Sequence, residues 1–330
     1  MTGGCGFIGS AAAEALLARG HDVVLCDSFT EAPYPVAWKA ANLEALRSCA
    51  AAHKRTLSFF ETDCGDLDSV LQATKATHVL HLAALSGLSP GIAATDVFRS
   101  NVLSSVSLME SAAKHAVHTV VLASSAAVYG DDGSCGPRLY NETDAAVQPL
   151  SVYGASKRCM ELAALPLCRA SPSLRCRIAR LFTIYGPRGR PDMAPWRFIR
   201  SMTAGESITL FGNGDAWRDF VYIDDAVQAL CYMLLEEGID EPAGQPAIFN
   251  VSSGRSVRLF EFVDAVERAT GCTAKRNSLP ARPGDVGGSL GNPNKALKML
   301  NWRAHTNLDD GLRRTVEWWR SERANPYRHE

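Results

Sequence analysis

The chain has 330 residues, of which 46% are hydrophobic and 21% are charged, a composition typical of a globular protein that buries a sizeable core. Its formal net charge of −1 gives no general attraction to nucleic acid or to an acidic membrane, so bound anions must be held by particular arginines. The ten cysteines lack CxxC pairs and metal-ligand spacing, which predicts reduced thiols and no metal site. No apolar run approaches the ~20 residues that span a bilayer, and no secretory signal is present, so we expect a cytosolic protein without a membrane segment unless an anchor is encoded upstream of Met1.

Amphipathic helical segments alternate with short apolar runs in the first part of the chain. This alternation is typical of βαβ units around a parallel sheet, with right-handed crossovers that place helices on both faces. We expect strands at residues 22–26, 57–61, 78–82 and 119–123, and helices at residues 11–19, 37–51, 95–114 and 152–169.

The alternation ends after residue 181, where a stretch rich in glycine, proline and arginine begins. We expect helices at 196–204 and 224–236, and strands at 208–211, 219–222 and 247–251, the last of which returns to the main sheet. The sequence therefore predicts two interleaved domains. Residues 1–182 and 218–252 would form the sheet domain, and residues 183–217 and 253–330 the smaller domain.

Three glycines open the first predicted helix in the pattern Gly3-x-x-Gly6-x-x-Gly9, and the next strand ends at Asp27. In a doubly wound fold, such glycines allow a tight turn and close approach of a pyrophosphate to the helix N-terminus. Asp27 would then accept hydrogen bonds from the adenosine ribose, which favours NAD over a 2′-phosphorylated cofactor. The motif normally follows the central strand of the sheet, and no strand precedes Met1, so we expect a truncated chain or a misplaced start codon.

A second pattern indicates acid–base chemistry. Tyr153 and Lys157 are one helical turn apart, so phenol and ammonium share a face. A tyrosine pKa of ~10 is too high for base work at pH 7, so a nearby cation such as Lys157 must stabilise the phenolate. Ser124 and Ser125 end an apolar strand, where parallel sheets present ligand-binding groups, and a serine hydroxyl there can align proton transfer. A Tyr/Lys pair alone is common on exposed helices, but with the serines it predicts a Ser125/Tyr153/Lys157 catalytic centre.

Several segments, in this order, resemble the signature motifs of the NAD-dependent epimerase/dehydratase family of extended short-chain dehydrogenases/reductases. They are Gly3-x-x-Gly6-Phe7-Ile8-Gly9, His81-Leu-Ala-Ala84, Ser124-Ser-Ala-Ala-Val-Tyr-Gly130, Tyr153-Gly-Ala-Ser-Lys157, Arg218-Asp-Phe-Val-Tyr-Ile-Asp-Asp225, Arg282-Pro-Gly-Asp285 and Gly311 with Glu317-Trp-Trp319. The resemblance implies a Rossmann-type doubly wound parallel sheet, here lacking its first strand, with a smaller interleaved C-terminal substrate domain. It also implies a homodimer that pairs the helix near 95–114 with the helix carrying Tyr153.

The same resemblance implies roles for individual residues. Tyr153 would be the base, Lys157 its partner and a ligand of the nicotinamide ribose, and Ser125 the second hydrogen-bond donor. A tightly bound NAD would be held by Gly3, Gly6, Phe7, Ile8, Gly9, Asp27, Asp63, Cys64, Leu82, Ala83, Ala84, Asn101, Tyr153 and Lys157.

Two alanines separate this chain from the 4,6-dehydratases of the family. Those enzymes carry an Asp-Glu pair where this sequence has Ala126 and Ala127. The chemistry that remains is reversible oxidation at C4 of a UDP-sugar. Tyr153 would remove the hydroxyl proton, and a 4-keto sugar that turns over before reduction would yield the C4 epimer.

The identity of the sugar depends mainly on the segment from Phe182 to Ala194, which resembles that of UDP-glucuronate 4-epimerases. UDP-glucose 4-epimerases carry an asparagine where Thr183 stands. A uronate carboxylate needs a cation and hydroxyl donors, and we assign these roles to Arg190 and Thr183, although Arg190 could instead be an exposed loop residue. Uronate epimerases usually have serines at the positions of Ala126 and Ala127, and the loss of these two hydroxyl donors permits a neutral sugar.

The nucleotide end of the substrate is assigned by resemblance to Arg218 and Arg282, which would hold the UDP diphosphate. We therefore expect NAD-dependent interconversion of UDP-glucuronate and UDP-galacturonate. A UDP-glucose 4-epimerase is the alternative within the family. An impaired protein that only binds NAD or a nucleotide sugar is the alternative of another class.

Overall fold

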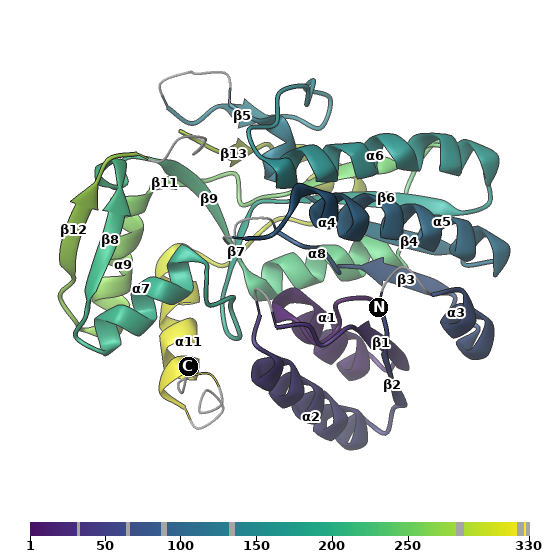
Figure 1. Ribbon diagram of the computed structural model, residues 1–330, viewed down its shortest axis with the longest axis horizontal. Coiled ribbons are helices and arrows are strands. Elements are labelled where there is room, and N and C mark those ends of the chain that lie inside the picture. The colour runs from purple at the N-terminus through teal and green to yellow at the C-terminus, as the bar shows by residue number, and fades with distance from the viewer. Residues whose placement is uncertain are drawn as a thin grey trace.

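The computed structural model describes residues 1–31, 34–63, 67–86, 91–131, 136–281 and 287–321, together with residue 327. Figure 1 shows a helix–sheet–helix sandwich on one side of the molecule and a smaller lobe on the other. No helix in the described part of the chain is both long and apolar enough to cross a lipid bilayer.

The main sheet is parallel and consists of two hydrogen-bonded groups. One pairs β1 (Val23–Asp27) with β2 (Leu57–Glu61), and the other has the order β10 (Ala247–Val251), β6 (Arg175–Leu181), β4 (Thr119–Ser125), β3 (His78–His81). The two groups meet at Thr2, which forms parallel bridges to both Cys26 and His81. The Cys26 amide donates to the Met1 carbonyl at 2.8 Å, and the Thr2 amide donates to the Leu80 carbonyl at 3.0 Å. Residues 1 and 2 thus lie between β1 and β3, at the place of the central strand.

Helices cover both faces of this sheet (Figure 1). One face carries α1 (Phe7–Ala18), α2 (Val36–His53) and α8 (Ile223–Leu235), and the other carries α3 (Asp68–Thr74), α5 (Ser104–Lys114) and α6 (Val152–Ala170). The buried strands supply both faces because successive side chains alternate. In β4, Val120 and Leu122 pack toward α5 and α6, whereas Val121 packs into the core on the side of α1 and α8.

The helix expected at 95–114 is interrupted. It consists of α4 (Ala94–Phe98), a π-helical turn η1 (Arg99–Leu103) and then α5. The Asn101 side chain, inside the π turn, exchanges two hydrogen bonds of 2.8 Å with the backbone of Leu85. Such turns are frequent at functional sites.

The smaller lobe is built mainly from the second half of the chain. Its three-stranded sheet joins β7 (Thr183–Tyr185), β9 (Trp217–Tyr222) and β11 (Ser256–Arg258), and two parallel pairs join β8 (Ser207–Phe211) with β12 (Lys275–Leu279) and β5 (Leu139–Tyr140) with β13 (Leu290–Gly291). Its helices are α7 (Ala194–Thr203), α9 (Leu259–Thr270) and α11 (Leu308–Arg320), with the short turn η3 (Gly212–Gly214). The helix α10 (Asn294–Leu300) packs on β10 and α8, and the turn η2 (Ala126–Tyr129) packs on α6. The strand β9 pairs within the smaller lobe, whereas α8 and β10, which follow it, pack on the main sheet. The expected division, with residues 1–182 and 218–252 in the sheet domain and residues 183–217 and 253–330 in the smaller domain, therefore stays a proposal.

Candidate active site

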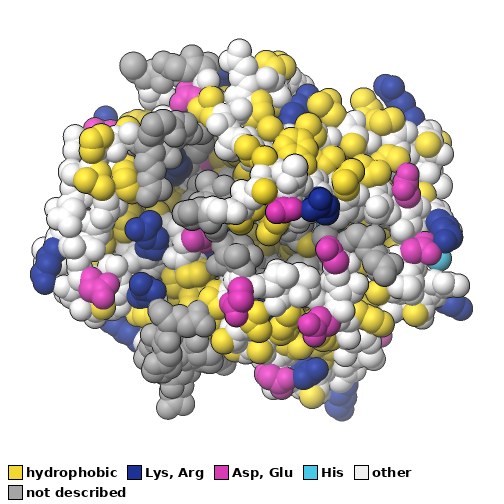
Figure 2. Space-filling model, in the orientation of Figure 1, with side chains coloured by type: hydrophobic (Ala, Val, Ile, Leu, Met, Phe, Trp, Pro, Cys, Tyr) yellow, Lys and Arg dark blue, Asp and Glu magenta, His cyan; other side chains and the backbone are white. Residues whose placement is uncertain are grey.

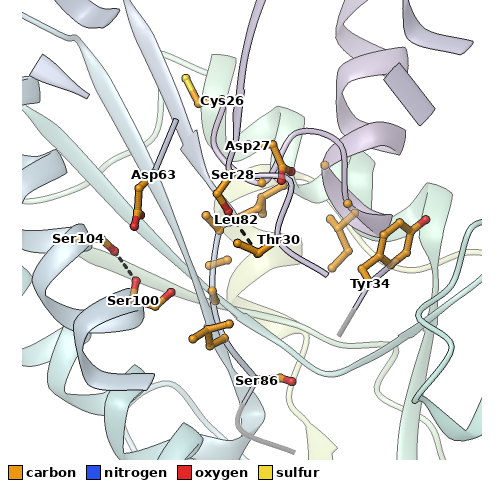
Figure 3. A pocket seen from close by; sticks show the side chains of 18 of the residues that line it. Cys26, Asp27, Ser28, Thr30, Tyr34, Asp63, Leu82, Ser86, Ser100 and Ser104 are labelled. Carbon is orange, nitrogen blue, oxygen red and sulfur yellow. Dashed lines mark hydrogen bonds between the residues drawn. The ribbon is translucent and has the colours of Figure 1, made fainter. Parts of the chain in front are cut away.

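A cavity of about 590 Å³ lies at the carboxyl ends of β1, β3 and β4. Ligands bind at this edge in open parallel sheets. Figure 3 shows Asp27 and Ser28 on one side of the cavity and Asp63, Ser100 and Ser104 on the other. Many of the predicted residues line it, namely Gly3, Gly6, Phe7, Ile8, Gly9, Asp27, Asp63, Leu82, Ala83, Ala84, Tyr153, Lys157 and Arg190.

The glycine turn forms the floor at the N-terminus of α1. Gly3 has a positive φ of 62°, and a Cβ on it would lie 2.9 Å from the Ala83 amide nitrogen. A Cβ on Gly9 would lie 2.1 Å from the Gly3 carbonyl oxygen. Side chains are therefore sterically excluded where the turn meets Ala83 and where α1 packs on the turn. The first amides of α1 remain directed at the cavity, and such a helix end attracts a phosphate.

Asp27 ends β1 at the cavity wall and has a partner that sequence reasoning missed. Its Oδ1 atom lies 2.9 Å from the Lys39 ammonium and accepts from the Phe29 amide, while Oδ2 accepts from the Cys5 amide. Lys39 is itself buried and lines the cavity. The sequence did contain a signal for a buried lysine, because Lys39 has the helical spacing of Leu43 and Leu46 and shares their buried face of α2.

The structure brings Ser125 and Tyr153 together. Ser125 is the last residue of β4, and its Oγ accepts from the Ala127 amide at 3.2 Å, so its hydroxyl proton is available for another acceptor. Desolvation raises the pKa of the Tyr153 phenol, and the charge of Arg190 and a hydrogen bond with Ser125 oppose that rise. The sequence predicts that Lys157 supplies the opposing charge. Arg190 is a second cation that lowers the Tyr153 pKa, and the role expected of Lys157, which lines the cavity, stays a prediction.

Asn101 is buried behind the cavity wall and connects it to the catalytic helix. Besides its two bonds with Leu85, its Nδ2 donates to Ser156 Oγ at 2.9 Å, and that hydroxyl donates to the Tyr153 carbonyl at 2.8 Å. Asn101 therefore fixes the backbone next to Ala84 and the first turn of α6, without itself lining the described cavity.

His81 continues this network to the glycine turn, and its tautomer follows from its neighbours. Ser105 donates its hydroxyl to the Asn101 carbonyl at 2.8 Å, so its oxygen accepts from His81 Nε2 at 3.0 Å. Nδ1 must then accept from the Thr2 hydroxyl at 2.7 Å, and the Thr2 oxygen accepts from the Ala83 amide. Burial lowers the pKa of His81 to about 3, so this imidazole is neutral.

Arg190 lies on the loop after β7 and is held by two acceptors. Its Nε and Nη2 atoms lie 3.0 and 2.6 Å from the two carboxylate oxygens of Asp192, and Nη2 also donates to Ser86 Oγ at 2.8 Å. The same loop is fixed to the sheet domain by an ion pair of 2.8 Å between Arg188 and Glu14. Arg190 is thus an oriented part of the cavity wall.

The remaining predicted residues are less directly placed. Thr183 begins β7, and Arg218 lies in β9, where its Nη1 donates to the Trp217 carbonyl at 2.8 Å. Thr183, Arg218 and Ser125 are not among the described residues that line the cavity. Cys64 and Arg282 fall outside the described residues.

A doubly wound parallel sheet, a glycine turn at its first helix, and a Ser/Tyr/Lys group at the carboxyl edge define a dinucleotide-binding α/β protein of the short-chain dehydrogenase/reductase type. The chain belongs to the NAD dependent epimerase/dehydratase family, whose match covers residues 1–252.

Similar proteins span nearly the whole chain. The UDP-glucuronate 4-epimerase of Thermodesulfobacterium geofontis (strain OPF15) is 31% identical over 96% of this chain and 94% of that protein. A Bacillus cereus UDP-glucuronic acid 4-epimerase, solved with UDP-glucuronic acid and NAD, is 29% identical with a TM-score of 0.84, covering 96% of this chain and 97% of that one. A UDP-glucose 4-epimerase from Thermotoga maritima, solved with UDP-glucose, is 27% identical with a TM-score of 0.84 and 97% coverage of both chains.

Proposed function

We propose that this protein epimerises a UDP-sugar at C4 with bound NAD, and that its substrate pair is UDP-glucuronate and UDP-galacturonate. The observation that carries the sugar assignment is the oriented Arg190 guanidinium in the cavity wall, close enough to affect the Tyr153 phenol. The names of several similar proteins, UDP-glucuronate 4-epimerase among them, support the same reaction.

The residues at the cavity fit NAD. Gly3, Gly6 and Gly9, with Phe7 and Ile8, would hold the pyrophosphate at the α1 N-terminus, and Asp27 with Lys39 would bind the adenosine ribose hydroxyls. Asp63 would border the adenine, as would Cys64, while the segment Leu82 to Ala84, supported by Asn101, would line the nicotinamide end. Bound NAD would supply a hydride acceptor and donor at C4 of the sugar.

The side chains move and hold the proton. Tyr153 accepts the proton of the sugar 4-hydroxyl, and Ser125 donates a hydrogen bond to the same oxygen. The positive charge of Arg190 favours the phenolate form that this step needs. Lys157 binds the nicotinamide ribose. When the 4-keto sugar has turned, Tyr153 returns the proton to the carbonyl oxygen and the C4 epimer forms.

The uronate carboxylate would contact Arg190 and Thr183, and the UDP diphosphate would contact Arg218 and Arg282. The second candidate is a UDP-glucose 4-epimerase. It is favoured by Ala126 and Ala127 in η2, whose methyl groups offer no hydroxyl to a carboxylate.

The proposal extends to a homodimer in a reducing compartment, the cytosol. α5 packs beside α6, and their neighbourhood exposes Leu103 by 60%, Val152 by 44% and Leu162 by 53%. Figure 2 shows hydrophobic side chains gathered over α4 and α6. Pairing this face with a second copy would remove that apolar surface from water. The eight cysteines within the described residues are free thiols, which suits a reducing compartment.

The test is to incubate purified protein with NAD and either UDP-glucuronate or UDP-glucose, and to separate the products by anion exchange. Tyr153→Phe serves as the control because it keeps the ring and removes only the hydroxyl. We expect UDP-galacturonate from the wild-type protein, none from Tyr153→Phe, and in Arg190→Met a larger loss of turnover with UDP-glucuronate than with UDP-glucose. UDP-galactose alone would select the second candidate. No product from folded, NAD-bound protein would leave a protein that only binds NAD or a nucleotide sugar.

A further inference from the structure

One face of α6 continues beyond the catalytic pair. Tyr153, Lys157 and Glu161 follow each other at intervals of four residues, so all three point from α6 in similar directions. Glu161 is only 3% exposed and lies between the helix and the main sheet. A carboxylate in such a place must have strong partners.

The Glu161 carboxylate binds two strands at once. Its Oε1 atom accepts from the Ser124 hydroxyl of β4 at 2.6 Å and from Arg180 Nε of β6 at 2.9 Å. Its Oε2 atom accepts from Arg180 Nη2 at 2.8 Å and from Arg158 Nη1 at 3.0 Å. Sliding or rotating α6 along the sheet would break several charge-assisted bonds together.

Arg180 is itself fixed, so it cannot follow the helix. Its guanidinium stacks over the Tyr129 ring, with 4.7 Å between Cζ and the ring centroid, and Nη1 donates to the Glu142 carbonyl at 3.2 Å. Burial is nearly complete, with an exposure of 1% for the arginine. The ion pair therefore joins α6 to a rigid point of the sheet.

Ser124 immediately precedes the catalytic serine, and its Cα lies about 3.8 Å from that of Ser125. Through Ser124, the carboxylate on α6 is tied to the strand end that presents Ser125, while two turns earlier α6 presents Tyr153. We propose that Glu161 is a positioning residue, which sets the separation of Ser125 and Tyr153 through its hydrogen bond with Ser124. This inference rests on the proposed function.

The competing explanation is that Glu161 and Arg180 only stabilise the fold. The chain offers a matched control in the same strand. Arg177, in β6, forms a comparable pair with the slightly more exposed Glu241, whose side chain is 10% exposed and whose Oε1 lies 2.7 Å from Nη2. Glu241 follows α8 and contacts none of the residues assigned to the site. Breaking that pair should cost stability without displacing Ser125.

The experiment compares Glu161→Gln, Glu241→Gln, Ser124→Ala and the double variant Glu161→Gln/Ser124→Ala. The Glu161 carboxylate accepts four hydrogen bonds from Ser124, Arg180 and Arg158, and a glutamine amide, with one acceptor atom and one donor atom, cannot accept all of them. Turnover, KM, bound NAD per subunit and the unfolding midpoint are measured for each. A displacement of about 1 Å can cost about 100-fold in rate, so we expect kcat of Glu161→Gln to fall about 10- to 100-fold. Its KM and NAD content should stay within about twofold of wild type.

The controls separate position from stability. Glu241→Gln should lower the unfolding midpoint and keep kcat within about twofold of wild type. Ser124→Ala should reduce kcat, and the double variant should be no slower than the slower of the two single variants, because both changes act on the same contact between Glu161 and Ser124. Equal kcat losses in Glu161→Gln and Glu241→Gln, or additive losses in the double variant, would overturn the inference while leaving the epimerase in place. A folded, NAD-bound wild type without turnover would instead refute the proposed function, and this inference with it.

Discussion

Replacing Gly9 by alanine should lower the stability of the protein even without nucleotide, whereas replacing Gly6 by alanine should not. A Cβ added at Gly9 would lie 2.1 Å from the Gly3 carbonyl oxygen and 2.9 Å from the Gly4 Cα, both backbone atoms that cannot rotate away. At Gly6 the nearest atom to a new Cβ is the same Gly3 oxygen, at 3.4 Å, which is ordinary contact. The two substitutions add the same methyl group to one turn, so they form a matched pair.

The magnitude follows from two opposing effects. A buried methyl forced more than about 1 Å inside contact distance belongs at the upper end of overpacking, which costs about 3 kcal/mol. Alanine in place of glycine within a helix returns about 1 kcal/mol. The net loss at Gly9 is about 2 kcal/mol. In a chain of 330 residues, that corresponds to a fall of about 3 °C in the unfolding midpoint.

Thermal unfolding is measured first without nucleotide and then across a titration of NAD. Gly9→Ala should have the lower midpoint already without NAD. Gly6→Ala should match the wild type without NAD and gain less on titration, because Gly6 lines the cavity and its methyl group would occupy space beside the pyrophosphate. A Gly9→Ala protein as stable as wild type in the absence of NAD would show that the steric reasoning is wrong.

Three further predictions concern the ribose site, a buried histidine and the exposed helical face. Lys39→Met should weaken NAD binding at least about tenfold in calorimetry, because a charge-assisted contact beside Asp27 is lost, whereas an unchanged Kd would place Lys39 outside the ribose site. His81 keeps a pKa of about 3 in the folded protein but regains about 6.5 when unfolded, so its contribution to the free energy of unfolding should fall by about 2 kcal/mol from pH 7 to pH 5. Urea unfolding of His81→Gln should lack that part of the pH dependence, and equal slopes in both proteins would contradict it. Leu162→Glu should yield monomers where the wild type yields dimers, as measured by size-exclusion chromatography with light scattering. Equal masses for the wild type and the variant would contradict this prediction.

The sequence predicts those parts of the site whose residues come at or directly after the carboxyl ends of strands. Parallel strands end at one edge, so the glycine turn and the segments after β3 and β4 had to converge there. The strands expected at 57–61 and 247–251 coincide with β2 and β10. Tyr153 and Ser125 could be paired in advance for the same reason, since α6 returns over the end of β4.

Contacts distant in sequence could not be anticipated in this way. The sequence pattern does not predict the strand β6, because Arg177 and Arg180 interrupt its run of apolar residues. Both arginines are buried, and their charges are matched by Glu241, 64 residues further along the chain, and Glu161, 19 residues back. The π turn has a similar origin, since Asn101 bonds to a backbone 16 residues away. In each case a tertiary partner overrides the local pattern.

The choice between a uronate and a neutral sugar depends on how much of Arg190 is left for substrate. Its Nε and Nη2 atoms already face the Asp192 carboxylate, which offsets part of the positive charge that Arg190 brings to the cavity and to Tyr153. A uronate adds a negative charge beside Asp192 and must share the guanidinium with it. Because Ala126 and Ala127 offer no hydroxyl, the shared guanidinium and Thr183 must supply the contacts to a carboxylate. Arg190 therefore selects for a carboxylate mainly by orientation. The relative turnover of UDP-glucuronate and UDP-glucose, more than the affinity for either, should reveal which sugar the site accommodates.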